Sequence, residues 1–364
     1  MSFDCAIIGA GPAGCAAALY LSRAGRTVVL LDRASFPRRK TCGEGIMPEG
    51  VEVLRELGLY EDAAALGRVF RGVAWTTRDG RHARCRFPGG EGLGAPREEL
   101  DHLLLKRAAA APGVRVLERS AASGVERTAE GVRVCLDAGE LFARRLIAAD
   151  GASSPSLLAL GVPRRGPARP RFGLAARLKG VGTGDLVEVF LFDGGELYLT
   201  PLPGEGRVSA ALLLERRALA PGPGGREEAF WRLLLAHPAL RARLARATLD
   251  TPVAGLGPLA TAPSRCEDGP WLAAGDAAGA VDPLVGDGIG LALRTGRLAA
   301  EETDAALRGD VRPGRYTRRR RKLLRPKRRL ARLALGLSRR PLLARAALAA
   351  LRAYPPAFSA LLRG

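Results

Sequence analysis

The sequence predicts an α/β fold: a nucleotide-binding domain with a parallel sheet, assembled from separate segments, joined to a domain with an antiparallel sheet and to a basic helical tail. A glycine-rich turn lies between two apolar strand patterns at the start of the chain. Two later buried strands end in loops that contain an acid and a glycine, and alternating strand patterns lie between them. The length of 364 residues suggests about two domains, and a composition of 47% hydrophobic and 26% charged residues excludes collagen-like, coiled-coil and wholly disordered chains.

The first element is a βαβ unit near the N-terminus. An apolar run over 5–8 leads into Gly-Ala-Gly-Pro-Ala-Gly at 9–14, a helix rich in Ala and Leu follows to residue 23, and a second apolar run over 27–31 ends in an acid. In such a unit the first glycine permits the tight turn, the second lets a pyrophosphate approach the backbone, and the third lets helix and strand pack closely. The helix N-terminus offers amides to the phosphate, and the acid, 23 positions after the first glycine, can accept hydrogen bonds from ribose hydroxyls. This Rossmann-like pattern predicts a dinucleotide site made of Gly9, Gly11, Ala13, Gly14, Asp32 and Arg33.

Two later segments decide between FAD and NAD(P). A strand pattern at 146–149 delivers Asp150 and Gly151 into a loop, and one at 271–274 delivers Gly275 and Asp276 before a glycine-rich helix start. An acid fixed at a strand end can hold a polyol hydroxyl, and the helix start presents N–H donors and a positive dipole end. Reduced flavin carries negative charge near its N1 and C2 oxygen, which such a helix stabilises. We therefore expect bound FAD; the residues placed at this helix start are Gly286, Gly288 and Ile289.

In this order and spacing the three motifs resemble the p-hydroxybenzoate-hydroxylase-like FAD-dependent oxidoreductases, the superfamily of group A flavoprotein monooxygenases and geranylgeranyl reductases. The resemblance implies that Asp32 binds the adenosine ribose, that Asp276 binds the ribityl chain, and that Asp150 and Gly151 lie near the pyrophosphate. It also implies that Arg97, which opens a predicted helix, reaches the FAD; the alternative is a solvated charge in the first helical turn. The family loop after the second acid usually reads Ser-x-Val-Arg. This chain has Ser-Pro-Ser-Leu at 154–157, so a contact from that arginine is missing or replaced.

The most distinctive stretch outside the glycine motifs is the loop at 36–48, which contains Lys-Thr-Cys-Gly at 40–43. A Lys-x-Cys-Gly sequence resembles the geranylgeranyl-reductase branch and some polyketide-associated hydroxylases, and the resemblance places this loop beside the isoalloxazine ring. Glycines there would let the backbone approach the ring closely. Cys42, Gly43 and Pro283 are therefore the candidate catalytic residues; the alternative for Cys42 is a small buried residue at a turn.

The antiparallel sheet is predicted from two segments. Residues 74–87 alternate around Asp79-Gly80, which is a hairpin signal, and from 186 to 214 the chain reads as three strands separated by a Gly-Gly turn and a Pro-Gly loop. The apolar strand residues predict a pocket for a hydrophobic small molecule. The predicted boundaries are 1–73, 98–165 and 266–310 for the FAD-binding domain, 74–97 and 166–265 for the substrate domain, and 311–364 for the tail.

Positive charge is concentrated in the tail. Lys and Arg number 57 against 37 Asp and Glu, a net charge of +20, and residues 311–364 hold 17 of the basic residues and no acid. The nearly neutral body argues against nucleic-acid binding, which needs a positive folded face. The basic run precedes leucines at 330, 333 and 337 and a second Leu- and Ala-rich segment at 342–351. It predicts an amphipathic helix in peripheral contact with an anionic membrane; the alternative is a helix packed on the FAD-binding domain.

Cysteine spacing and the N-terminus predict the location. The six cysteines include no pair at CxxC spacing, which favours neither a metal site nor a disulfide framework. No signal-peptide pattern is present, and the uncharged run at 5–22 carries the glycines of the nucleotide motif, so it is not expected to span a membrane. We expect a cytoplasmic protein that is peripheral to the membrane through its tail.

The resemblance implies an FAD-dependent monooxygenase, a hydroxylase of secondary metabolism. NAD(P)H would bind transiently, since no second GxGxxG is present, and oxygen would form a flavin C4a-hydroperoxide that attacks a hydrophobic or aromatic, polyketide-like metabolite. The alternative is a reductase similar to geranylgeranyl reductase, which transfers hydride from flavin N5 to a C=C bond of a prenyl or lipid substrate. The Lys-x-Cys-Gly loop and the basic tail favour it, although the second aromatic residue of those reductases' aromatic–proline motif is missing.

Two further activities are not expected. Halogenases carry Trp-x-Trp-x-Ile-Pro where this chain has Tyr-Leu-Thr-Pro-Leu-Pro at 198–203, which argues against halogenation. A non-enzymatic membrane or nucleic-acid adaptor built on the tail would give a colourless purified protein.

Overall fold

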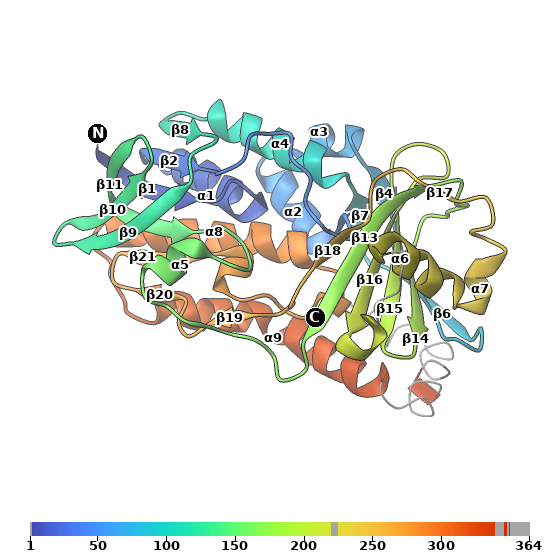
Figure 1. The fold of residues 1–364 in the computed structure, drawn as a ribbon. Coiled ribbons are helices and arrows are strands. Elements are labelled where there is room, and N and C mark those ends of the chain that lie inside the picture. Colours follow the sequence, from blue (N-terminus) through green and yellow to red (C-terminus); the bar gives the residue numbers. More distant parts are fainter. Residues whose placement is uncertain (1, 220–224, 339–345, 348, 350–364) are drawn as a thin grey trace.

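The computed structural model describes residues 2–219, 225–338, 346–347 and 349 and contains two eight-stranded sheets with helices packed on them (Figure 1). The first sheet runs in the order β20 (Glu267–Asp268), β21 (Trp271–Ala273), β11 (Gly139–Ala148), β1 (Ser2–Ile8), β2 (Val28–Leu31) and β8 (Val114–Leu117), with β10 (Gly131–Leu136) and β9 (Ala122–Thr128) attached through β11. The predicted strands β21, β11, β1 and β2 are parallel neighbours, so the loops that follow them open at one edge of the sheet. The predicted α/β class is confirmed.

Helices pack against the first sheet and against one another. They are α1 (Pro12–Arg23), α2 (Pro48–Glu56), α3 (Tyr60–Ala65), α4 (Arg97–Ala109), α5 (Pro155–Ala159) and α8 (Gly288–Leu307). α1 contacts both α4 and α8. The approach of α8 to α1 requires Gly296, because a Cβ at that position would lie 2.2 Å from the carbonyl oxygen of Ala13. This close packing brings the N-termini of α1 and α8 to the same cavity, described below.

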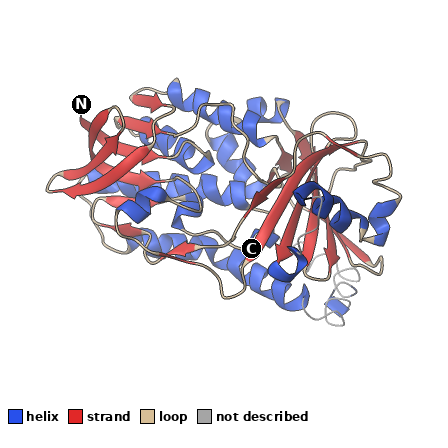
Figure 2. Cartoon of the chain, in the orientation of Figure 1, coloured by secondary structure: helices blue, strands red, loops and turns tan. Residues whose placement is uncertain are grey.

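Helices lie on one face of the second sheet (Figure 2), and side chains of the other face line the cavity described below. Its order is β17 (Thr248–Leu249), β13 (Arg171–Lys179), β16 (Val208–Glu215), β15 (Gly195–Pro201), β14 (Val187–Phe192), β5 (Gly72–Thr76) and β6 (His82–Arg86), with β18 (Ala254–Leu256) beside β13. The predicted hairpin is β5–β6, and the three predicted strands are β14, β15 and β16. Side chains of β16 alternate: Leu214 packs in the cluster that includes Phe230 of α6 (Gly225–Leu235), near α7 (Pro238–Arg241), whereas Ala211 and Leu213 line the cavity. The five strands predicted for the antiparallel sheet are present, whereas β13, β17 and β18 were not predicted and β14 pairs with β5 in parallel.

Short elements connect the two sheets. One small sheet contains β3 (Gly45–Ile46), β7 (Gly92–Gly94) and β4 (Arg68–Phe70), a second pairs β12 (Arg164–Arg165) with β19 (Ala262–Pro263), and the 3-10 turns are η1 (Arg216–Leu219), η2 (Gly275–Ala278) and η3 (Pro283–Val285). Within the described part of the chain, no helix has both the length and the apolar character needed to cross a membrane. The domain boundaries given above stay a prediction.

The last long helix, α9 (Arg315–Ser338), packs along the molecule with one face. Its buried residues recur every three or four positions: Tyr316, Arg320, Leu324, Lys327 and Ala331. The predicted leucine face is divided, because Leu330 is half-buried while Leu333 is 59% exposed. The side chain at 337 and most of the segment 342–351 lie outside the described residues. The packed arrangement, one of the two alternatives, therefore holds for one face of α9, and membrane contact stays a prediction.

Candidate active site

A cavity of about 810 Å³ lies between the loop edge of the first sheet and the inner face of the second sheet. Every predicted site residue except Gly14 lines it. They are Gly9, Gly11, Ala13, Asp32, Arg33, Cys42, Gly43, Arg97, Asp150, Gly151, Gly275, Asp276, Pro283, Gly286, Gly288 and Ile289. Folding thus brings together motifs that are spread over most of the chain, and their contact with FAD stays a prediction residue by residue.

The glycine turn at the start of α1 has two different functions. Gly9 has φ +104°, and a Cβ there would lie 2.4 Å from the carbonyl oxygen of Ala149. A Cβ on Gly14 would lie 1.8 Å from the Gly9 carbonyl oxygen, so this glycine serves packing, as predicted, and does not line the cavity. At Gly11 the nearest atom to a Cβ is Nη2 of Arg38, 3.8 Å away. The backbone at Gly11 is therefore open to the cavity and leaves room for a pyrophosphate over the helix N-terminus.

Asp32 is oriented by backbone amides. Its Oδ2 accepts a hydrogen bond from the Ala10 N–H at 2.9 Å and its Oδ1 accepts one from the Ala34 N–H at 2.9 Å. Nη2 of Arg38 lies 3.5 Å from Asp32 Oδ2 and Nη1 lies 3.3 Å from Asp101 Oδ2. The carboxylate is held at the end of β2, where it can receive ribose hydroxyls, and Arg38 adds a positive charge that the motif did not indicate.

Arg97 is a buried cation and not a solvated first-turn charge, which removes the alternative considered from the sequence. Its side chain is 10% exposed, and its Nε and Nη2 each donate to Asp101 at 2.8 Å. Burial acts against the charge, but Asp101 and the thiol of Cys42 favour it, and the pKa of Arg97 lies above its ordinary value. The guanidinium therefore remains charged at the wall of the cavity.

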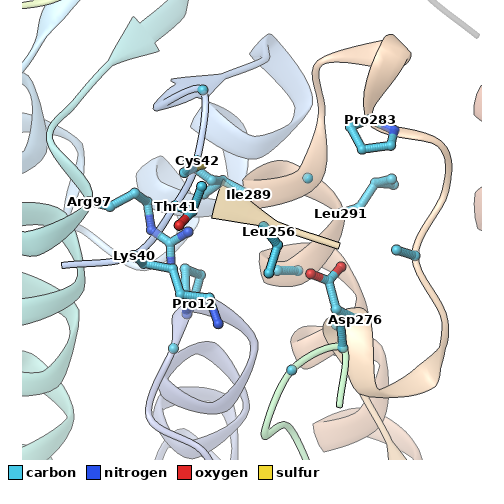
Figure 3. A pocket seen from close by; sticks show the side chains of 18 of the residues that line it. Pro12, Lys40, Thr41, Cys42, Arg97, Leu256, Asp276, Pro283, Ile289 and Leu291 are labelled. Atoms are coloured by element: carbon cyan, nitrogen blue, oxygen red, sulfur yellow. The ribbon is translucent and has the colours of Figure 1, made fainter. Parts of the chain in front are cut away.

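Asp276 faces Lys40 and Arg97 across the cavity (Figure 3). It follows β21 in η2, and the Gly275 N–H is held by Thr295 Oγ1 at 2.9 Å. Asp276 and Lys40 are exposed within the cavity, yet the surrounding protein displaces much of their water. Burial raises the pKa of Asp276, against the lowering effect of Lys40 and Arg97, and burial together with Arg97 lowers the pKa of Lys40. A polyol hydroxyl would thus find an acceptor and a cation facing one another.

The buried carboxylate of Glu44 holds the loop that carries Cys42 in place. Glu44 has φ +59°, and its side chain accepts hydrogen bonds from the Arg97 N–H at 3.0 Å and from Arg177 Nη2 of β13 at 2.6 Å. Arg177 also donates to Glu98 at 2.8 Å. Cys42 is half-buried at the cavity, and its Sγ accepts from the Glu44 N–H at 3.3 Å. Glu44 and Arg177 were missed, because nothing in the sequence marks two charges 133 positions apart as partners.

Pro283 lies in η3, which is tied to the second sheet. Asp282 Oδ1 accepts from the Leu284 N–H at 3.0 Å and from Arg171 Nη1 at 2.7 Å, and Tyr198 donates to the Leu284 carbonyl at 2.8 Å. Arg171 also pairs with Glu196. Burial raises the pKa of Glu196 to about 7 although Arg171 opposes the rise. These bonds fix the segment between Pro283 and the N-terminus of α8, which offers amides to an anionic ring edge.

Two sets of hydrogen bonds hold the loops that follow β11 and β21, near the place where this chain departs from the family motif. Asp150 accepts hydrogen bonds from Ser154 Oγ at 2.5 Å and the Ser156 N–H at 2.9 Å, so the Ser-Pro-Ser-Leu sequence closes its own loop. The carbonyl oxygens of Asp276 and Ala277 accept from Arg164, at 3.0 and 2.7 Å. An arginine outside the family motif therefore holds the loop after β21.

The cavity continues from these polar residues to an apolar wall on the second sheet. Its lining there includes Val73, Trp75, Leu174, Ala175, Val187, Val189, Ala211, Leu213, Leu256 and Leu259. Thr200 and Tyr198 are the polar side chains on this wall, and the Tyr198 hydroxyl is already bonded. Among the described residues, no three His, Cys, Asp or Glu side chains gather where they could hold a metal ion.

Comparisons with known proteins agree with this geometry. The profile of a family described as FAD binding domain matches residues 2–325. A menaquinone reductase of Mycobacterium tuberculosis is 35% identical over 325 residues, which cover 84% of this chain and 77% of that protein. A digeranylgeranylglycerophospholipid reductase of Methanopyrus kandleri is 29% identical over 332 residues, covering 85% of this chain and 79% of that protein. The structure of a flavin-dependent brominase superposes with a TM-score of 0.87 at 19% identity, over 100% of this chain and 93% of that chain, which shows a shared fold.

Proposed function

This chain belongs to the FAD-binding-domain family of FAD-dependent oxidoreductases, and from that membership we propose that it is a reductase that saturates C=C bonds in the prenyl chain of a lipid or quinone. The observation that carries the proposal is the apolar wall of the cavity, which continues directly from the residues predicted at the flavin. A prenyl chain offers no hydrogen-bonding groups and is bound by burial of its carbon surface, at about 25 cal/mol per Å². The relatives reported above are reductases named for polyprenyl compounds, which supports this substrate class.

Reduction of a C=C bond adds a hydride to one carbon and a proton to the other. Bound FAD supplies hydride transfer, and NAD(P)H, binding transiently, is the proposed source of the electrons. The chain must then hold the double bond against the ring and provide the proton. Cys42 is the proposed donor, because its half-buried thiol lines the cavity among the residues predicted to lie beside the flavin.

The proposal is tested by single-turnover reduction without oxygen. Dithionite-reduced enzyme is mixed anaerobically with a menaquinone that carries an unsaturated chain, or with a geranylgeranylated phospholipid, dispersed in detergent. We expect the flavin absorbance to return and the product to gain two hydrogen atoms in its chain, measured by mass spectrometry. Absence of that product would contradict the proposal.

The monooxygenase, which the sequence led us to expect first, is tested in the same apparatus. Reduced enzyme is mixed with oxygenated buffer in the presence of phenols or polyketides. A transient absorbance band before reoxidation, with an oxygen atom inserted into the aromatic product, would replace the reductase by the hydroxylase. Direct reoxidation without oxygen insertion agrees with the reductase.

Cys42→Ala is expected to retain FAD and to slow turnover by about 100-fold, the usual size of a lost general-acid contribution. Chain saturation is measured under steady-state conditions, and flavin content is read from the absorbance of the purified variant. Cys135→Ala is the matched control, since Cys135 is half-buried in β10 and does not line the cavity. Equal turnover in Cys42→Ala and the parent would make Cys42 a packing residue at a turn.

A further inference from the structure

The outward face of α9 carries a basic stripe that no acidic residue balances. Six exposed cations recur along it at helical spacing: Arg318, Arg321, Lys322, Arg325, Arg329 and Arg332. At 100° per residue they occupy an arc of about 100°, opposite the buried face that contains Tyr316 and Leu324. From this arrangement we infer that α9 is an interfacial helix that docks the protein on an anionic lipid surface. The inference rests on the proposed function, to which it adds the source of the substrate.

Three acids near the start of α9 are paired with cations outside the stripe, and Glu267 accepts a hydrogen bond from the Thr317 N–H. Glu301 and Glu302 bind Arg319 at 2.7 Å each, and Glu302 and Asp310 bind Arg315 at 2.6 Å each. None of the six cations of the stripe has a carboxylate partner among the described residues. An unneutralised stripe of this kind attracts anionic headgroups, and each charge contributes separately to binding.

Leu333 lies at the edge of the basic arc and is 59% exposed. A single exposed leucine on a surface is unremarkable, but this one lies one helical turn after Arg329, about 40° from it around the axis, beside the basic stripe. Cations at headgroup level with an apolar side chain beside them are the pattern of helices that lie in a membrane interface. The exposed leucine therefore fits a lipid surface better than it fits RNA, which would contact the cations and leave the leucine in water.

The opposite side of α9 forms part of the cavity. Arg320, Leu324 and Leu330 line it, and Arg320 Nη2 donates to the Gly279 carbonyl at 2.6 Å. α9 runs along the side of the molecule that also bears the end of the second sheet (Figure 1). One helix thus has its cationic face outward and its apolar residues on the substrate cavity. Docking through this helix would place the cavity next to the bilayer in which a prenyl lipid is dissolved.

The inference is tested with vesicles and the full chain. The triple variant Arg318→Gln/Arg325→Gln/Arg329→Gln removes three charges of the stripe and no cavity residue. The control, Arg84→Gln/Arg169→Gln/Arg246→Gln, removes three exposed charges elsewhere. We expect the parent and the control to sediment with phosphatidylglycerol vesicles but not with phosphatidylcholine vesicles. Each lost charge of the stripe should weaken binding about fivefold, hence the triple variant by about 100-fold.

Activity separates this inference from the proposed function. The triple variant should reduce a detergent-dispersed prenyl substrate at the parental rate and lose rate only when the substrate is embedded in anionic vesicles. Equal vesicle binding by the triple variant and the control would overturn the docking surface while detergent activity still supports the reductase. Binding of single-stranded RNA in preference to anionic vesicles, lost in the triple variant, would also overturn it. If the parent protein does not reduce the detergent-dispersed prenyl substrate, that result would contradict the proposed function instead.

Discussion

Gly11→Val is expected to give a folded protein that purifies without FAD. Gly11 has φ −76° and ψ −176°, values that valine adopts readily, and a Cβ there would meet only Arg38 Nη2 at 3.8 Å. The added side chain would therefore enter the cavity over the N-terminus of α1 and not the protein core. It would occupy the space in which a pyrophosphate accepts hydrogen bonds from the first-turn amides. Losing two such charge-assisted bonds weakens binding by about 100-fold or more.

Flavin absorbance per mole of protein measures this loss, and circular dichroism reports whether the fold is retained. Gly89→Val is the matched control, because Gly89 lies in an exposed loop and a Cβ there has no atom within 4 Å. The control should be yellow and as active as the parent. A Gly11→Val protein with the parental flavin content would contradict the placement of the cofactor at this turn. Gly14 is unsuitable for the test, since its side chain would strike the Gly9 carbonyl and disturb the fold itself.

The sequence was most informative where a local pattern determines both structure and chemistry. The turn at 9–14, the acid after β2 and the glycine-rich start of α8 each need particular residue types at fixed spacing, and all three were predicted to meet at one site. Five strands of the second sheet, β5, β6, β14, β15 and β16, were also predicted, because apolar alternation and Gly or Pro turns are local signals, whereas β13, β17 and β18 were not predicted. The parallel strand β8 and the pair β9–β10 were not predicted.

The sequence does not predict contacts between charged residues that lie far apart in the chain. In the sequence, Glu44 and Arg177 look like ordinary surface charges. The fold places them in one buried ion pair under the Cys42 loop. Arg97 likewise had two possible environments. Its pairing with Asp101, one turn along α4, is a local contact, but its burial depends on how α4 packs in the fold. Tertiary packing of this kind is revealed neither by hydrophobic periodicity nor by motif spacing.

In the basic helix α9 the sequence likewise does not show which cations are buried by tertiary packing. Its composition predicted a cationic amphipathic helix, and the outward face agrees with that pattern. Lys327 and Arg320, however, belong to the packed face together with Tyr316, whose hydroxyl donates to the Ala273 carbonyl. In a run so rich in basic residues, the sequence cannot distinguish the two cations that are buried against acids and carbonyls from the six that face outward. The buried Lys327 has a large expected energetic effect.

Lys327→Met is expected to lower the free energy of unfolding by about 3–5 kcal/mol, the usual cost of removing one partner from a buried ion pair. Lys327 is 1% exposed, and its Nζ lies 2.8 Å from Glu49 Oε1 and 3.5 Å from Asp287 Oδ2. Asp287 is fully buried and its carboxylate oxygens accept no hydrogen bond from the described residues, so Lys327 is the cation that balances its charge. Methionine retains much of the apolar volume of lysine, so the substitution mainly removes the positive charge. Urea denaturation measures it, with Lys322→Met on the exposed face of the same helix as a control expected to stay within about 0.5 kcal/mol of the parent.

The pH dependence of the destabilisation by Lys327→Met identifies its cause. Burial raises the pKa of Asp287 from its ordinary 3.8 to about 6, with Lys327 opposing the rise. Because the folded protein binds this proton more tightly than the unfolded chain, the contribution of Asp287 to stability falls as pH rises through that interval and is least favourable above about pH 6. Without Lys327 the pKa moves higher, so the destabilisation of Lys327→Met should be larger at about pH 8 than at about pH 5. Adding Asp287→Asn should restore part of the stability at the higher pH, since the buried charge is then gone; a loss independent of both pH and Asp287 would instead mean that Lys327 acts through its packing alone.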